Sequence, residues 1–411
     1  MVSVPMRFSA GPPLSWYAPE MTRPTGAPTR VAVLSTNRAD YSTVRPILRA
    51  ATGRSDIEMF LLAVGNHWRS DDRNRPPTLD ADHEAAAYWG PLTSEHGSID
   101  LSPEWLAAFT IWIHGRLAAL RPDILLVIGD RFEVMPAATS ALLLEIPIAH
   151  VSGGDMTLGA IDNQVRFALS MMSSIHFVSH ESHARRLTAM GEASSTVHLV
   201  GEPALGDIPK APQLKRSELF VRLGLRESDL LVLLTYHPPT IAREQWKGEL
   251  ESLVGALSDF PGALIITGAN GDPQSREVNE RLSAFAARHP NAAVVSSLGA
   301  DLYYEVLHHA SFMIGNSSSG IWEAPSVGLP VINIGERQAG RIRAANVMDS
   351  PADIEILRDL IGKALDPEMI RVAGNVSNPY FQPKSATQIV QLLAKTGQLE
   401  GLLRKQFPGA L

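Results

Sequence analysis

The chain has 411 residues, a net charge of −7 at neutral pH, and 45% hydrophobic residues. This length suggests two or three domains of about 150 residues each, and the negative charge argues against nucleic acid, which attracts basic surfaces. Because the sequence contains no cysteine, disulfide bonds, thiolate metal ligands and a cysteine nucleophile are all excluded. An anionic small ligand stays possible, since a few arginine side chains in one cleft suffice to bind it.

The first 28 residues are rich in proline, glycine and serine and lack a compact apolar segment like that of a signal peptide. We interpret residues 1–28 as a flexible N-terminal extension. No apolar run in the sequence approaches the roughly 20 residues that a membrane helix needs. The sequence therefore predicts a cytoplasmic protein that binds neither nucleic acid nor a membrane.

From residue 29 onward, short apolar segments alternate with longer helical patterns. The predicted strands cover residues 30–35, 57–64, 124–128, 146–151, 174–179, 196–200, 230–236, 263–267, 292–296, 312–316 and 330–335. Nearly continuous apolar strands are typical of parallel sheets buried on both faces. Eleven such strands are too many for one doubly wound domain, and the Pro-, Gly- and charge-rich segment 201–215 separates them as a candidate linker. The sequence thus predicts two Rossmann-like α/β domains that face each other across a central cleft.

The first polar cluster follows strand 30–35. Open parallel sheets bind ligands outside the carboxyl ends of their strands, and Arg38 and Asp40 lie at such a strand-to-helix turn. Helix N–H groups favour an anion there, and an arginine can bind a phosphate through two hydrogen bonds. As an alternative, Asp40 or Ser42 caps the helix, a role that leaves Arg38 unexplained.

A second cluster follows strand 124–128, where Asp130, Arg131 and Glu133 end an apolar run. Its position at the carboxyl end of a strand favours a ligand site. The alternative is that the Asp130–Arg131 pair only solvates the loop, since exposed ion pairs are common without function.

The third cluster is the loop after strand 146–151, with His150, Asp155 and Asp162 around a Gly-Gly pair that allows close backbone approach. Two carboxylates and a histidine are suited to proton transfer, which needs groups with shifted pKa values near the reacting carbon. Asp162 has an alternative role as a helix N-cap, with Arg166 as its surface partner four residues later.

In the second half, His237 follows strand 230–236 on a proline-containing turn. It either contacts a phosphate or only satisfies a neighbouring carbonyl group. Asn270 and Asp272 follow strand 263–267, where a structural Asx turn is the alternative explanation.

The strongest signal follows strand 312–316, where three serines and a glycine open a helix. Hydroxyls and backbone N–H groups of this kind, among them Ser317 and Ser318, suit a diphosphate. Glu323 lies about one helical turn further on, where it can accept hydrogen bonds from ribose hydroxyls. A basic segment that begins at Arg337 lies behind it. The sequence shows no metal-binding spacing, and it lacks the glycine motifs that bind NAD or ATP.

These motifs together resemble the hydrolysing UDP-N-acetylglucosamine 2-epimerase family, and within it the branch that serves sialic and legionaminic acid synthesis. The resemblance spans roughly residues 29–390. It rests on six ordered motifs, RADYSTVRPIL, IGDRFE, HVSGGDMTLGAIDNQVR, YHPPT, GNSSSGIWEAP and GERQAGRIRAANV.

The resemblance implies a GT-B architecture without a dissociable cofactor or metal. It implies an N-terminal Rossmann-like domain over 29–205, a nucleotide-binding Rossmann-like domain over 206–376, and C-terminal helices over 377–411 that return to the first domain. Homodimers or homotetramers are also implied. The implied partner is a nucleotide-diphosphate sugar, most simply a UDP-sugar.

The implied reaction on UDP-N-acetylglucosamine starts with removal of the C2 proton and anti elimination of the nucleoside diphosphate. Water then adds to the resulting glycal, giving N-acetylmannosamine and UDP. The implied catalytic residues are Arg38, Asp130, Asp155, Asp162 and His237. The implied substrate- and nucleotide-binding residues are Arg38, Ala39, Ser42, Arg131, His237, Asn270, Asp272, Ser317, Ser318, Glu323 and Arg337.

The sequence departs from the family's pattern at several positions. Many members carry Glu where this chain has Ser152, some carry His, and several carry Lys at the position of Thr43; Trp322 replaces an Arg or aliphatic residue. A serine without a neighbouring base cannot act as a general acid or base near neutral pH. This departure raises the alternative of a retaining 2-epimerase, whose product stays on its diphosphate. The motifs also leave open a GT-B glycosyltransferase and an inactive sugar-nucleotide sensor.

Overall fold

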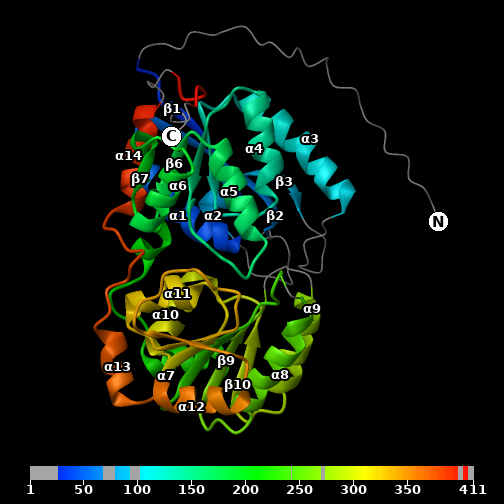
Figure 1. Cartoon of the computed structure of the whole chain (residues 1–411), viewed down its shortest axis with the longest axis vertical. Coiled ribbons are helices and arrows are strands. Elements are labelled where there is room, and N and C mark those ends of the chain that lie inside the picture. The colour runs from blue at the N-terminus through cyan, green and yellow to red at the C-terminus, as the bar shows by residue number, and fades with distance from the viewer. Residues whose placement is uncertain are drawn as a thin grey trace, which may run out of the picture.

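The computed structural model describes residues 26–67, 79–92, 102–241, 243–269, 274–396 and 401–405. It contains two α/β domains, each built around a parallel sheet, with one domain above the other in Figure 1. The predicted fold class of two parallel-sheet domains is therefore confirmed. Among the described helices, none is long and apolar enough to cross a membrane.

The first domain has a seven-stranded parallel sheet in the order β3-β2-β1-β4-β5-β6-β7. The strands are β1 (Thr29–Asn37), β2 (Ile57–Asn66), β3 (Tyr88–Leu92), β4 (Ile124–Ile128), β5 (Ile148–Val151), β6 (Ile175–Val178) and β7 (Val197–Leu199). The α-helices are α1 (Arg38–Ala51), α2 (Ala81–Ala86), α3 (Pro103–Leu120), α4 (Val134–Leu143), α5 (Asp162–Met172) and α6 (Glu181–Ala189), with short 3-10 helices at Ser194–Thr196 and Pro203–Asp207. Two apolar clusters bury the two faces of this sheet.

The second domain has a six-stranded parallel sheet in the order β10-β9-β8-β11-β12-β13. Its strands are β8 (Leu231–Thr235), β9 (Ala263–Thr267), β10 (Ala292–Val295), β11 (Phe312–Gly315), β12 (Val331–Ile334) and β13 (Val347–Ser350). The α-helices are α7 (Arg216–Leu223), α8 (Trp246–Leu257), α9 (Ser275–Ala286), α10 (Gly299–His309), α11 (Ser319–Trp322), α12 (Ile354–Ala364) and α13 (Pro367–Gly374), with 3-10 helices at Arg243–Gln245 and Ala324–Val327.

All eleven predicted strands are present. The sequence missed β3 and β13, which are edge strands of their sheets. In each sheet the strand order reverses between the first strand and its neighbour, at β1/β4 and at β8/β11. A reversal of this kind leaves a crevice at the carboxyl ends of the strands, where ligands bind.

The last helix, α14 (Ser385–Thr396), packs on the first domain, although the second domain precedes it in the chain. Figure 1 places this helix beside β1. Ile389, Val390 and Leu393 are fully buried in the apolar cluster of the first domain, and Thr29 Oγ1 donates to Ala394 O at 2.9 Å. The chain therefore passes between the domains twice.

The first passage differs from the linker that the sequence predicted over 201–215. Pro203 and Leu205 are buried, so this part is packed rather than a solvated spacer. The passage also contacts the second one: the N–H of Glu202 donates to Tyr380 O at 2.8 Å, and Ser385 Oγ donates to Gly201 O at 3.1 Å. The Pro-, Gly- and charge-rich segment 201–215 thus begins as a packed crossing between the domains and not as a solvated linker.

Candidate active site

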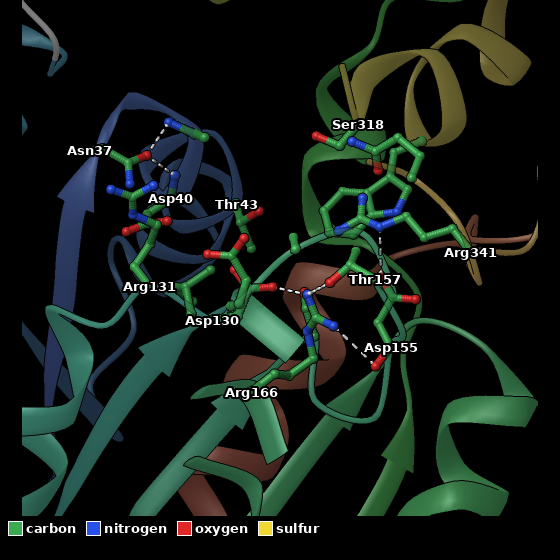
Figure 2. A pocket seen from close by; sticks show the side chains of 18 of the residues that line it. Asn37, Asp40, Thr43, Asp130, Arg131, Asp155, Thr157, Arg166, Ser318 and Arg341 are labelled. Carbon is green, nitrogen blue, oxygen red and sulfur yellow. Dashed lines mark hydrogen bonds and ion pairs between the residues drawn. The ribbon is translucent and has the colours of Figure 1, made fainter. Parts of the chain in front are cut away.

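The carboxyl ends of both sheets face an interdomain cleft (Figure 2). In Figure 2, Asn37, Asp40 and Arg131 lie across the pocket from Ser318 and Arg341, which belong to the second domain. A second cavity adjoins the first, and Arg38, Ala39 and Ser318 line both. The members of this second cavity also include Ser42, His237, Ser317 and Glu323. The cleft therefore brings together the predicted catalytic and binding residues that the structure describes, whereas the candidates His150 and Glu133 line neither cavity.

The turn after β1 is organised by an asparagine that the sequence interpretation missed. Asn37 is the N-cap of α1, and its Oδ1 accepts from the N–H groups of Ala39 and Asp40 at 2.7 and 3.0 Å. Asp40 instead accepts from Thr36 N at 3.0 Å, and Ser42 Oγ donates to Ala39 O. The capping role considered for Asp40 or Ser42 is thus wrong. Burial raises the pKa of Asp40 to about 6, against the hydrogen bonds from Thr36, which lower it.

Arg38 is the first residue of α1 and reaches the second domain. Its Nη1 donates to Ser296 O at 3.1 Å. The side chain lines both cavities, so its guanidinium lies where a ligand spanning them must pass. This position fits the predicted phosphate contact.

Asp130 is paired with a buried arginine. Arg166 is 1% exposed and forms an ion pair with the Asp130 carboxylate; it also donates to Asp155 O and to Thr157 Oγ1, each at 3.1 Å. Figure 2 shows these acceptors grouped around the guanidinium. Arg166 is therefore buried and not the surface partner of Asp162 that the sequence allowed, although the Asp162 charge still acts on it.

Asp162 begins α5 and lines the pocket. The N-cap of this helix is Ile161, so Asp162 is not the cap that the alternative interpretation required. Its carboxylate is only partly buried. Asp162 and Asp130 are thus two carboxylates on the first-domain side of one pocket.

Asp155 also lines the pocket but is 2% exposed and held from two sides. Its carboxylate lies 3.3 Å from Arg341 Nε and 3.3 Å from His183 Nε2. Burial opposes its ionisation, but Arg341, His183 and Arg166 together outweigh it and hold the pKa of Asp155 well below its usual range. A general base needs a pKa near the working pH, so Asp155 is poorly suited to that role.

His150 does not reach the pocket, contrary to the sequence interpretation. Its ring is fully buried and bonds Gly129 O at 2.6 Å and Ser170 Oγ at 3.2 Å. Burial lowers the pKa of His150 to about 4, so the ring is neutral at physiological pH. It supports the backbone around β5 and Gly129.

A buried glutamate lies beneath the two positions at which the sequence departs from the family pattern. Thr43 Oγ1 donates to Glu202 Oε1 at 2.7 Å, and Ser152 Oγ donates to Glu202 Oε2 at 3.0 Å. Glu202 was missed because it lies in the segment interpreted as a linker. Its position three residues after the end of β7 was the available signal, since strand carboxyl ends face the cleft.

In the second domain, Asn316 holds the His237 turn. Its Oδ1 accepts from His237 N at 2.7 Å, and its Nδ2 donates to His237 O at 2.8 Å. Gly315 precedes it with φ of 135°, where a Cβ would lie 1.9 Å from Thr235 O. Only glycine allows this approach between β11 and β8, so the strand ends place His237 on the cavity wall.

The serine-rich turn after β11 is ordered by its own hydroxyls. Ser317 Oγ accepts from Ser319 N at 3.3 Å, and Tyr303 OH donates to Ser319 Oγ at 2.6 Å. Glu323 follows with a buried Oε2 that has no partner among the described residues. Burial, together with the nearby Glu202 carboxylate, raises the pKa of Glu323 to about 7. An unpaired buried carboxyl oxygen favours a ligand that donates a hydrogen bond to it, as a ribose hydroxyl would.

The basic segment after β12 lines the pocket that also contains Asp130 and Asp162. Arg337 donates to Asn316 O at 3.2 Å, and the Arg341 guanidinium lies 4.6 Å from the centroid of the Trp322 ring. Trp322 Nε1 and Arg341 Nη1 are buried and have no hydrogen-bond partner within the described ranges. An unpaired buried donor costs about 1–3 kcal/mol, so this pocket favours an oxygen-rich ligand that pairs with both.

The loop before α5 touches the second domain directly. Leu158 N donates to Ala339 O at 2.8 Å, and Ile161 N donates to Thr240 Oγ1 at 3.1 Å. Between them, a Cβ on Gly159 would lie 2.1 Å from Glu336 O. The glycine therefore permits the backbone contact that closes one wall of the cleft.

Two predicted residues cannot be placed, and one possible metal group lies outside the first pocket. Asn270 and Asp272 fall outside the described residues. Within those residues, Asp80, Asp82 and His83 form the one group whose ligand atoms lie close enough to share an ion. Asp80 is already paired with Arg49, so the prediction of no metal remains a prediction.

The comparisons with known proteins agree with this geometry. A family model described as UDP-N-acetylglucosamine 2-epimerase matches residues 96–394. The GDP/UDP-N,N'-diacetylbacillosamine 2-epimerase (hydrolyzing) of Campylobacter jejuni is 31% identical over 380 residues, covering 92% of this chain and 98% of that protein. The chain belongs to the UDP-N-acetylglucosamine 2-epimerase family. The Legionella pneumophila UDP-N,N'-diacetylbacillosamine 2-epimerase (hydrolyzing) is 29% identical over 368 residues, or 89% of this chain and 95% of that protein.

Membership in the 2-epimerase family makes this protein an epimerase and confirms the predicted resemblance to the hydrolysing branch. It favours an epimerase over a glycosyltransferase or a sensor. Among solved structures, the S. aureus MnaA–UDP co-structure has a TM-score of 0.71 at 17% identity and covers 93% of this chain and 100% of that one. The Methanocaldococcus jannaschii UDP-GlcNAc 2-epimerase complex with UDP-GlcNAc and UDP has a TM-score of 0.66 at 19% identity, over 89% and 99% of the two chains. These likenesses confirm the GT-B-type fold.

Proposed function

We propose that this epimerase is a hydrolysing 2-epimerase of a UDP-linked 2-acetamido sugar. The observation that carries the proposal is the division of the cleft, with carboxylates Asp130 and Asp162 in one cavity and the serine turn and Glu323 in the second. Arg38 lies in both cavities, where the diphosphate of a bound nucleotide sugar would join the two ends. The printed names of relatives at 31% and 29% identity support N,N'-diacetylbacillosamine as the sugar, and that of a 25% relative supports N-acetylglucosamine.

The nucleotide end of the cleft stabilises the leaving group. Arg38, His237 and the Ser317–Ser318 hydroxyls surround the proposed diphosphate site. Donors aimed at charge that develops in the transition state lower the barrier most in a water-poor site. Glu323 accepts from the ribose, which fixes the nucleotide without touching the reacting bonds.

The sugar end removes the proton on C2. Asp162 is the proposed base because it lines the pocket and is only partly buried. Asp130, by contrast, is already engaged in an ion pair with Arg166. Transfer of the C2 proton to Asp162 and loss of UDP leave a glycal. Arg337, Arg341 and Trp322 hold the sugar substituents during this step.

Addition of water to the glycal, rather than return of the diphosphate, completes the proposed reaction. The retaining alternative rests on Ser152 having no base beside it in the sequence. Glu202 Oε2 lies 3.0 Å from Ser152 Oγ. Glu202 therefore places a carboxyl beside Ser152 that the sequence did not reveal. This contact supports the hydrolysing reaction.

Proton NMR in D2O tests the proposal, with UDP-N,N'-diacetylbacillosamine and UDP-N-acetylglucosamine supplied separately. Deuterium at C2, free 2-epimeric sugar and UDP are the expected products of at least one of them. Deuterium at C2 of a sugar that stays on its diphosphate would establish the retaining reaction instead. Absence of both exchange and UDP release with either sugar would reject the proposed function.

A further inference from the structure

The Glu202 carboxyl is buried in a cage of hydroxyl groups. The residue is 1% exposed, and its oxygens accept from Thr43 Oγ1 at 2.7 Å, Ser152 Oγ at 3.0 Å and Ser179 Oγ at 3.4 Å. These hydroxyls come from α1 and from the ends of β5 and β6. After burial, the largest influences on the ionisation of Glu202 are hydrogen bonds from hydroxyl and backbone donors.

Burial disfavours the charged form of this carboxyl. Burial raises the pKa of Glu202, although its hydrogen bonds lower it. The Glu323 carboxyl lies near enough for the two negative charges to oppose each other, and Arg341 acts on Glu323 in the opposite sense. The setting therefore favours the protonated carboxyl, whose proton would point toward one of the hydroxyl oxygens.

Two of the three hydroxyls connect the Glu202 carboxyl with the cleft. Ser152 and Thr43 line the same pocket as Asp130 and Asp162, whereas Glu202 itself does not. Ser152 adopts a φ of 66°, a left-handed conformation that costs free energy in a residue other than glycine. In this conformation Ser152 lines the cleft while its Oγ donates to the Glu202 carboxyl beneath it.

We propose, resting on the hydrolysing 2-epimerase function above, that Ser152 Oγ returns a proton to the sugar and that Glu202 is the positioning residue that supplies it. The O–H bond of Ser152 breaks as the new C–H bond forms at C2 of the glycal, and the Glu202 proton moves to Ser152 Oγ. The hydroxyl of an incoming water molecule bonds to C1. The proton released by that water returns to the Glu202 carboxylate, so the pair is restored and one water has been added.

The proposed proton transfer from Glu202 through Ser152, called the relay below, acts on water addition and not on elimination of UDP. The two halves of the reaction can therefore be measured separately. Glu202→Gln keeps the size and most hydrogen bonds of the side chain but holds no acidic proton, and Ser152→Ala removes the atom that touches the sugar. In single-turnover NMR with the substrate that the wild type accepts, both variants should release UDP while free 2-epimer forms at least about 100-fold more slowly. The glycal should accumulate in proportion. Ser173→Ala, which removes a buried hydroxyl bonded to Leu169 O, serves as the matched control and should give the wild-type product ratio.

A purely structural role for Glu202 would slow both halves together. If UDP and free sugar fall in parallel in Ser152→Ala, with no glycal, the relay is wrong. The same holds if Glu202→Gln makes free sugar at the wild-type rate. If the wild type releases no UDP from either sugar, the proposed function itself is rejected, and the relay with it. If the wild type releases UDP and free sugar but a variant gives one of the two results just described, only the relay is rejected.

Discussion

At the scale of single residues, two aspartates of one loop illustrate how environment divides chemical roles. Asp155 and Asp162 both line the pocket. Asp155 is buried against Arg341 and His183, so its charge serves to hold those side chains. Asp162 is only partly buried at the start of α5 and lines the pocket, which suits the role of base proposed for it. Sequence spacing alone could not separate them, because burial decides their pKa values.

Substitution of the two aspartates should therefore affect different quantities. Asp162→Asn should lower kcat by about 10²–10⁴-fold with little change in thermal stability. Asp155→Asn should destabilise the fold by about 3–5 kcal/mol, since it leaves buried cations without their partner. Rates of C2 deuterium exchange and thermal unfolding measure these effects. The exposed Asp359→Asn on α12 is the control, and wild-type exchange in Asp162→Asn would contradict the assignment of the base.

The raised pKa of Glu323 predicts a pH dependence of stability. Between its ordinary pKa of 4.5 and about 7, the folded protein binds a proton that the unfolded chain has lost, so the contribution of this group falls as pH rises through that interval. Glu323→Gln removes the ionisation. The midpoint of thermal unfolding of this variant, relative to wild type, should be higher at pH 8 than at pH 5. An equal difference at both pH values would show that Glu323 ionises normally.

At the scale of elements, the loop between β5 and α5 closes the cleft through a contact that only glycine permits. A side chain on Gly159 would collide with the backbone at Glu336. Gly159→Ala should therefore lower kcat/KM at least about 10-fold, because a misplacement of about 1 Å in a site can cost up to about 100-fold in rate. Its thermal midpoint should change little, since no core side chain is lost.

Gly248→Ala is the matched control for this loop, because a Cβ at that helical position meets nothing within 4 Å. It should leave kcat/KM unchanged and stabilise the helix slightly, as alanine favours helix over glycine. Steady-state kinetics and thermal unfolding on both variants decide the matter. Equal kcat/KM in the two variants would show that the contact at Gly159 does not shape the site.

The strands show why sequence patterns predict the centre of a sheet better than its edges. Interior strands such as β4 and β8 are buried on every residue, so their continuous apolar runs are easily recognised. The missed strands β3 and β13 pair on one side only. Edge strands tolerate Pro, Gly and charge, as in YWGPL and VMDS, and these residues conceal them.

At the scale of the whole molecule, α14 fastens the chain end to the first domain. Leu393 is fully buried in the cluster beside β1, so Leu393→Ala should cost about 2–5 kcal/mol of unfolding free energy. Gln391→Ala, at an exposed position of the same helix, should change it by less than about 0.5 kcal/mol. Chemical denaturation measures both. Similar values for the two variants would show that the helix does not stabilise the domain.

The site was predictable to the extent that polar residues follow recognisable strands. Arg38, Asp130, His237 and Ser318, which line the cleft, were predicted because each follows an apolar run. Glu202 was not predicted, because a glutamate between a glycine and a proline resembles part of a linker. Its place beneath the cleft emerges only in the structure, where Thr43 and Ser152, far apart in sequence, bond the same carboxyl. Homo-oligomeric assembly and a cytoplasmic location remain predictions.

The paired passages between the domains determine how the molecule can move. A body attached at one point can swing and twist freely, but two attachment points joined by the Glu202–Tyr380 and Ser385–Gly201 hydrogen bonds leave essentially one axis of rotation. We therefore expect the second domain to rotate about this one axis, so that the cleft widens while the facing loops keep their alignment. A single cut in 206–215 would remove one attachment point and leave both domains attached through the remaining one.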